Sequence, residues 1–176
     1  MYNSFKIYSE QAHLFLCIGV LFAFLSCQRH SDMQEEGAAF LQGVWQQDSI
    51  PGQEDMLRYT LHELRFTCDS MYATMYVHAS VKTMPDSCFK GGQWTEYAKA
   101  VYVVRGDSMI VEGVYTKENG KQKISGCYKH GQYLPRFKIA YYSSDSLVLE
   151  SRFDSRPLIM KKTADIVCVP KKRWEM

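Results

Sequence analysis

The sequence contains one serine whose neighbours could make it a nucleophile. Ser108 follows an aspartate in the run Gly106–Met109 (Gly-Asp-Ser-Met), a grouping that a hydrolase could use. A nucleophilic serine needs a positioned base beside it. The last histidine of the chain is His130, so the C-terminal region has no histidine that could be this base. Three copies of the dipeptide Asp-Ser are spaced 38 residues apart, at positions 69–70, 107–108 and 145–146. A repeated turn sequence explains this spacing, so we interpret Ser108 as a turn residue.

Histidines and carboxylates offer two further chemistries, metal binding and acid–base catalysis. His62 and His78 have no His-x-His or His-x-x-x-His spacing, and the register predicted below puts them on opposite faces of a hairpin. Glu63, Glu112 and Glu150 fall at polar positions of predicted strands, where we expect them to face solvent. The sequence therefore predicts no metal site, no cofactor and no catalytic residues, and we do not expect an enzyme.

An apolar run near the N-terminus predicts where the protein goes. Leu14–Cys27 follows a short polar segment with one base, Lys6, and ends Phe-Leu-Ser-Cys. A transmembrane helix needs about 20 apolar residues, so this shorter run is typical of a secretory signal peptide over residues 1–26. Its ending resembles a bacterial lipobox, which implies a lipid on Cys27. We expect residues 27–37 to be the lipidated cysteine and a flexible tether, at the outer membrane or in the periplasm.

Composition limits what the rest of the chain can be. Residues 27–176 make up 150 of the 176 residues, enough for one domain with a real core. The chain has 21 Lys and Arg against 19 Asp and Glu, a net charge of +2. A nucleic-acid-binding protein would have a stronger basic bias, so we exclude nucleic acid as a partner.

Alternating runs on both sides of these three Asp-Ser dipeptides predict three β-hairpins. A two-residue loop would give the first hairpin an apolar face made of these opposed pairs: Cys68 and Met71, Phe66 and Ala73, Leu64 and Met75, His62 and Val77. Further strands near 43–48 and 157–163 bring the count to eight in up-and-down order. Because such a meander can close on itself, we predict an all-β fold, an eight-stranded up-and-down barrel over residues 38–165 with a tail at 166–176.

The start of the first predicted strand adds a family resemblance. Leu41–Trp45 reads Leu-Gln-Gly-Val-Trp, and its Gly43 and Trp45 resemble the Gly-x-Trp motif of lipocalins. More closely, the chain is similar to small lipocalin-like lipoproteins of Gram-negative bacteria. The resemblance implies that Trp45 seals one barrel end beneath a cation from beyond the last strand. Three candidates for this cation stay open: Lys161, Lys162 and Arg173. Lipocalins also have a helix after the last strand, and residues 166–176 show no helical pattern.

Four cysteines remain in the predicted domain, an even number that suggests two disulfides in an exported protein. In an up-and-down barrel, Cys68 lies beside the first Asp-Ser turn, and Cys168 follows a strand that runs toward the same end. Cys88 and Cys127 lie in connections at the opposite end. We therefore predict the pairs Cys68–Cys168 and Cys88–Cys127.

These features favour a binding protein. We expect a lipid-anchored lipoprotein whose barrel binds a small apolar ligand, in a cavity lined by Phe66, Met71, Met75, Val104 and Val111. The alternative is a structural or interaction lipoprotein with a packed barrel that recognises another envelope component. An internal void above about 300 Å³ would favour the first hypothesis.

Overall fold

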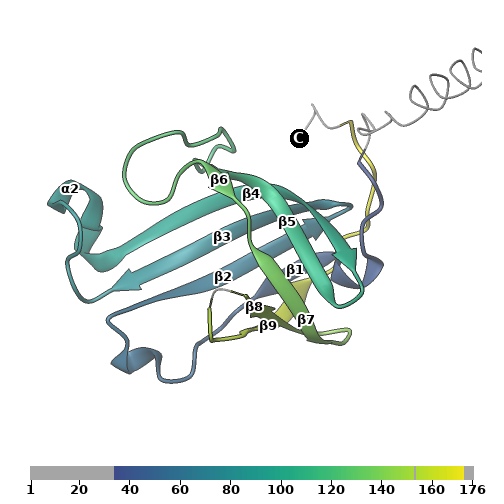
Figure 1. Ribbon diagram of the computed structural model, residues 1–176, viewed down its shortest axis with the longest axis horizontal. Helices are drawn as coiled ribbons and strands as arrows, with labels where there is room; N and C mark the ends of the chain where they lie inside the picture. The colour runs from purple at the N-terminus through teal and green to yellow at the C-terminus, as the bar shows by residue number, and fades with distance from the viewer. Residues whose placement is uncertain (1–33, 153, 173–176) are drawn as a thin grey trace, which may run out of the picture. The chain divides into compact units, whose positions relative to one another are not determined.

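The computed structural model describes residues 34–152 and 154–172, and within them the fold is all-β (Figure 1). The predicted signal peptide and Cys27 lie outside the described residues, as does Arg173. The strands are β1 (Gly43–Gln46), β2 (Arg58–Thr67), β3 (Ser70–Ala79), β4 (Gln93–Arg105), β5 (Ser108–Thr116), β6 (Gln132–Tyr133), β7 (Arg136–Tyr142), β8 (Ser146–Ser151) and β9 (Leu158–Ala164). The short helical segments are η1 (Ala39–Leu41), η2 (Gln53–Asp55), α2 (Asp86–Phe89) and η3 (Lys90–Gly92).

Eight of these strands close into an antiparallel barrel. Each long strand pairs with the next along the chain, β9 pairs with β1, and β5 pairs with β7. The two-residue strand β6 is an extra element beside β5. The predicted eight-stranded up-and-down barrel is therefore confirmed.

The three Asp-Ser dipeptides at 69–70, 107–108 and 145–146 lie at hairpin turns, with the serine opening the following strand. Ser70, Ser108 and Ser146 are the first residues of β3, β5 and β8. The predicted register of the first hairpin is wrong by two residues, because its loop is Cys68-Asp69 and Phe66 pairs with Met71. A shift of two keeps every side chain on its predicted face, since the period of a strand is two.

The barrel interior is packed solid at the end that holds these turns, which we call the closed end. Seventeen buried residues from the eight barrel strands, β6 and η1 form one apolar cluster. Trp45 has no exposed surface, its Nε1 donates to the Leu41 carbonyl at 2.8 Å, and the Lys162 Nζ lies 5.0 Å from the centre of its ring. Of the two candidate cations within the described residues, Lys162 is the one that lies over Trp45.

Both ends of the described chain are fixed to the closed end. The Gln34 N–H donates to the Lys171 carbonyl at 2.9 Å, and the Gln34 side chain donates to Ser70 Oγ at 2.8 Å. The Glu35 N–H donates to the Asp69 carboxylate at 3.0 Å. These contacts correct the expectation that the whole of residues 27–37 is a flexible tether. Figure 1 shows the C-terminal segment running beside the N-terminal one.

Both predicted disulfides are present, Cys68–Cys168 and Cys88–Cys127. The first ties the C-terminal segment to the turn between β2 and β3. Gln42 braces the same turn, because its side chain accepts from the Cys68 N–H at 2.7 Å and donates to the Cys68 carbonyl at 2.9 Å. The second joins α2 to the loop between β5 and β6, at the other end of the barrel.

Candidate ligand-binding site

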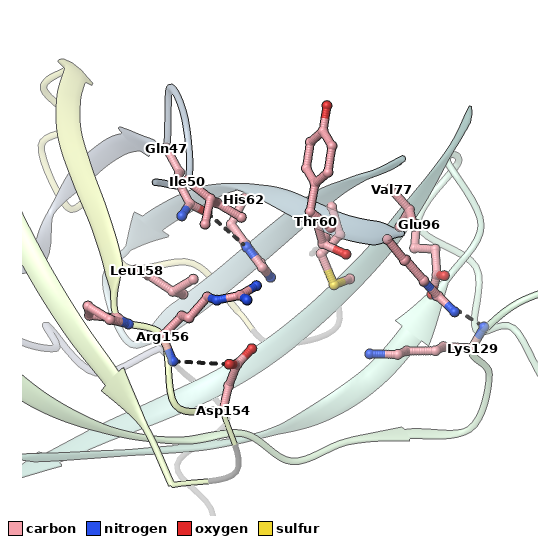
Figure 2. Close-up of a pocket in the computed structure, with 14 residues that line it drawn as sticks. Gln47, Ile50, Thr60, His62, Val77, Glu96, Lys129, Asp154, Arg156 and Leu158 are labelled. Carbon is pink, nitrogen blue, oxygen red and sulfur yellow. Dashed lines mark hydrogen bonds between the residues drawn. The ribbon is translucent and has the colours of Figure 1, made fainter. Parts of the chain in front are cut away.

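A hollow of about 410 Å³ opens at the end of the barrel opposite the closed end, which we call the mouth (Figure 2). The hollow exists because the core cluster stops partway along the barrel. On β2, Leu64 and Phe66 are buried in that cluster, whereas Thr60 and His62, the next inward positions toward the mouth, line the hollow. The lining residues are Gln47, Ile50, Arg58, Tyr59, Thr60, His62, Met75, Val77, Glu96, Lys129, Asp154, Arg156, Pro157 and Leu158.

A second lobe of about 370 Å³ lies next to the hollow. The two lobes share His62, Met75, Lys129, Asp154, Arg156 and Leu158. The second lobe adds aromatic side chains from the opposite wall, Tyr115, Tyr133 and Phe137. Burial raises the pKa of Tyr115 to about 12 and also raises that of Tyr133, so both phenols stay neutral.

His62 lies between the two lobes and is neutral. Burial lowers its pKa from 6.5 to about 4, and the positive charge of Lys129 adds to this effect. Its Nδ1 lies 3.3 Å from Oε1 of the buried Gln47 side chain. The predicted inward direction of His62 is correct, but its position on the wall of a cavity was not expected.

One carboxylate is buried in the wall of the hollow. Glu96 is only 4% exposed and accepts hydrogen bonds from Trp94 Nε1 at 2.9 Å and from the Lys129 N–H at 3.3 Å. Through these two bonds, Glu96 is a structural acceptor that holds the loop carrying Lys129. The alternation of buried residues along β4 includes Glu96, so this pattern could have identified it from the sequence.

Aromatic stacking and a disulfide fix the loop that carries Lys129, the connection between β5 and β6. The Tyr128 ring stacks on Trp94 with 4.9 Å between centroids, and its hydroxyl donates to the Cys88 carbonyl. On the β2 side, the Arg58 guanidinium lies 5.2 Å from the centre of the Trp94 ring. Together with the Cys88–Cys127 disulfide, these contacts position the rim of the mouth.

The five predicted cavity-lining residues are mostly in the core. Met75 lines both lobes of the hollow. Phe66, Met71 and Val111 have no exposed surface and belong to the packed cluster, against which the half-buried Val104 also packs. These four lie too deep in the barrel, where side chains fill the interior. The sequence had correctly placed them on the inner face.

The other chemically suggestive residues lie apart from the hollow or outside its wall. Ser108 follows the turn between β4 and β5. Glu112 and Glu150 are exposed and form ion pairs with Arg136 and Lys138. His78 stacks on Tyr59 at 4.8 Å. Within the described part of the chain, no group of three or more His, Cys, Asp or Glu side chains has the arrangement of a metal site.

Comparisons with models of protein families, with curated proteins and with solved structures found no match to this chain. In residues 34–152 and 154–172, no helix combines the length and apolar character that a membrane span requires.

Proposed function

We propose that the protein is a lipid-anchored lipoprotein of the bacterial cell envelope, and that its barrel binds a small, largely apolar ligand at the mouth without chemistry. The hollow of about 410 Å³ carries this proposal. Pockets that bind small molecules measure about 300–1,000 Å³ and combine apolar walls with a few polar groups. Met75, Val77 and Leu158 supply apolar surface here, and His62 and Gln47 supply polar groups.

The location in the envelope is supported by two disulfides, because such bonds persist in oxidising compartments. The lipid on Cys27 would also orient the barrel. Six residues lie between Cys27 and Gln34, which is bonded to the closed end, and the seven Cα–Cα steps from Cys27 to Gln34 span at most about 25 Å. The mouth would therefore point away from the membrane that holds the lipid.

Expression of the full chain in a Gram-negative bacterial host tests the anchor. We expect the protein in the membrane fraction, with an N-terminal peptide whose mass shows cleavage before Cys27 and acylation of that residue. The variant Cys27→Ser should lose the added mass and leave the membrane fraction. An unmodified Cys27 in a protein that was exported and formed its disulfides would contradict the lipoprotein part of the proposal.

Native mass spectrometry tests the ligand site in the same preparations. We expect a co-purifying small molecule that is lost from the variant Thr60→Trp, whose larger side chain would fill the hollow. Leu61→Trp is the matched control, since Leu61 is the next residue on β2 and lies on the outer face. Equal ligand occupancy in the two variants would exclude the hollow as the binding site.

A packed scaffold is the second candidate, and the core cluster favours it. Seventeen buried residues fill the barrel from the closed end to its middle. A ligand-free mass in every preparation, together with crosslinks from the protein to another envelope component, would support this candidate over ligand binding.

A further inference from the structure

We propose that the hollow recognises an anion, and that its ligand is a small amphiphile whose single acidic group is bound between Arg156 and Lys129. This inference rests on the proposed ligand-binding function. Figure 2 shows both side chains extending into the hollow from opposite sides. Arg156 comes from the connection between β8 and β9, and Lys129 from the connection between β5 and β6.

Among the described residues, the basic side chains of the hollow have no acidic partners. In residues 34–152 and 154–172, no carboxylate oxygen lies within 4.0 Å of a side-chain nitrogen of Arg58, Lys129 or Arg156, and the five ion pairs found there involve other basic residues. One guanidinium nitrogen of Arg156 donates to Met56 Sδ at 2.8 Å, a weak acceptor. A ligand oxygen would be a stronger acceptor, because hydrogen bonds between ionised groups are the strongest that side chains form.

The two carboxylates of the hollow are already engaged by main-chain or indole N–H groups. Glu96 accepts from Trp94 and from the Lys129 main chain, and Asp154 accepts from the Arg156 N–H at 3.1 Å. With His62 neutral, three basic and two acidic residues leave the lining with one net positive charge. A monoanion would balance this charge, whereas a cationic ligand would add to the excess.

The apolar part of the lining indicates the chemistry of the ligand beyond its acidic group. Met75 and Val77 are nearly fully buried and form an apolar part of the wall, and Phe137 does the same in the second lobe. Charged groups at the rim and apolar groups deeper in the barrel fit a molecule with an acidic end and a hydrocarbon body. A carboxylate suits Arg156 because a guanidinium can bind its two oxygens in parallel.

Isothermal titration of the purified full chain with three probes of equal chain length tests the inference: decanoate, decan-1-ol and decylammonium. We expect decanoate to bind most tightly, and its affinity to fall with added salt. Arg156→Gln should weaken decanoate binding about tenfold or more and leave decan-1-ol within about twofold, because only the anion uses the charge-assisted bond. Lys129→Gln should act in the same direction with a smaller effect, since Lys129 is a point charge without the guanidinium fork.

Arg152→Gln is the matched control, because Arg152 is an exposed base in the same connection that does not line the hollow. It removes the same net charge and should leave decanoate binding unchanged. Equal affinities for decanoate and decan-1-ol, or equal losses in the Arg156 and Arg152 variants, would overturn the anion site while leaving ligand binding intact. Decanoate binding that survives Thr60→Trp would place the probe elsewhere and overturn the assignment. Failure of all three probes to bind would overturn it too, and an apo mass in the native preparations would then refute ligand binding separately.

Discussion

Removal of the Cys68–Cys168 disulfide should destabilise the protein more than removal of Cys88–Cys127. The first bond closes a loop of 100 residues and the second a loop of 39. In the chain-entropy model, the restriction of the unfolded chain contributes about 4.7 kcal/mol for the longer loop and about 3.9 kcal/mol for the shorter one. We expect the double variant Cys68→Ala/Cys168→Ala to lose about 4–5 kcal/mol of unfolding free energy.

The native-state contacts support this comparison. Gln42 bonds both main-chain groups of Cys68, and the Tyr102 hydroxyl donates to the Cys68 carbonyl at 2.9 Å, so the turn keeps these bonds when alanine replaces the cysteine. The C-terminal segment has fewer alternatives. The Gln34 N–H donates to the Lys171 carbonyl, and the Lys171 N–H donates to the Gln34 side chain, and these two bonds hold the C-terminal segment beside the N-terminal one. Loss of order in the C-terminal segment would lower the unfolding free energy further.

Urea unfolding followed by tryptophan fluorescence measures the effect, with Cys88→Ala/Cys127→Ala as the matched control. Amide hydrogen exchange supplies a second readout, because protection of the Gln34 and Lys171 amides should fall in the first variant and persist in the second. A loss smaller than that of the control variant, or one below about 1 kcal/mol, would refute the loop-length argument.

Three further predictions follow from single side chains. The folded-state pKa of His62, about 4, lies below its unfolded value of 6.5, so its contribution to stability is fully present above about pH 6.5 and is lost as the pH falls toward 4. Urea unfolding across this range should show a loss up to about 3 kcal/mol larger in the wild type than in His62→Gln, and parallel profiles would contradict the assignment. Lys162→Met should lower the unfolding free energy by about 1 kcal/mol, because it removes the cation over Trp45. Lys161→Met should lower it less, because Lys161 is exposed and makes only a surface ion pair. Equal losses of unfolding free energy in the two variants would count against the cation–π contact. Gly113→Ala should cost about 1–3 kcal/mol, because a Cβ there would lie 2.1 Å from a main-chain oxygen of β4, and an unchanged midpoint of thermal unfolding would contradict this packing.

The local pattern was sufficient for the topology and for the cysteine pairing. Asp-Ser turns at equal spacing and alternating runs give antiparallel neighbours, and the parity of an up-and-down meander assigns each cysteine to one end. The predicted register of the first hairpin was wrong by two residues, but the predicted faces of its side chains were still correct. Only a shift by an odd number of residues moves side chains to the other face. The β7–β8 register shifts between Ile139 and Tyr141, so the alternation of side chains along β7 is interrupted at Ala140.

The sequence by itself therefore determined which side chains face the barrel interior, and the tertiary structure decided how deep each one lies. A period of two gives the face of a strand and carries no information on position along the barrel axis. Met71 and Met75 were therefore equivalent in the sequence, and although both are buried in the core cluster, only Met75 also borders the hollow. Lys129 and Arg156 come from irregular connections that follow no local period. The path of the Lys129 connection depends on the Cys88–Cys127 disulfide and on the stacking of Tyr128 against Trp94, and the Arg156 side chain contacts Met56. The two basic side chains are far apart in the sequence, and they line the same hollow only in the folded barrel.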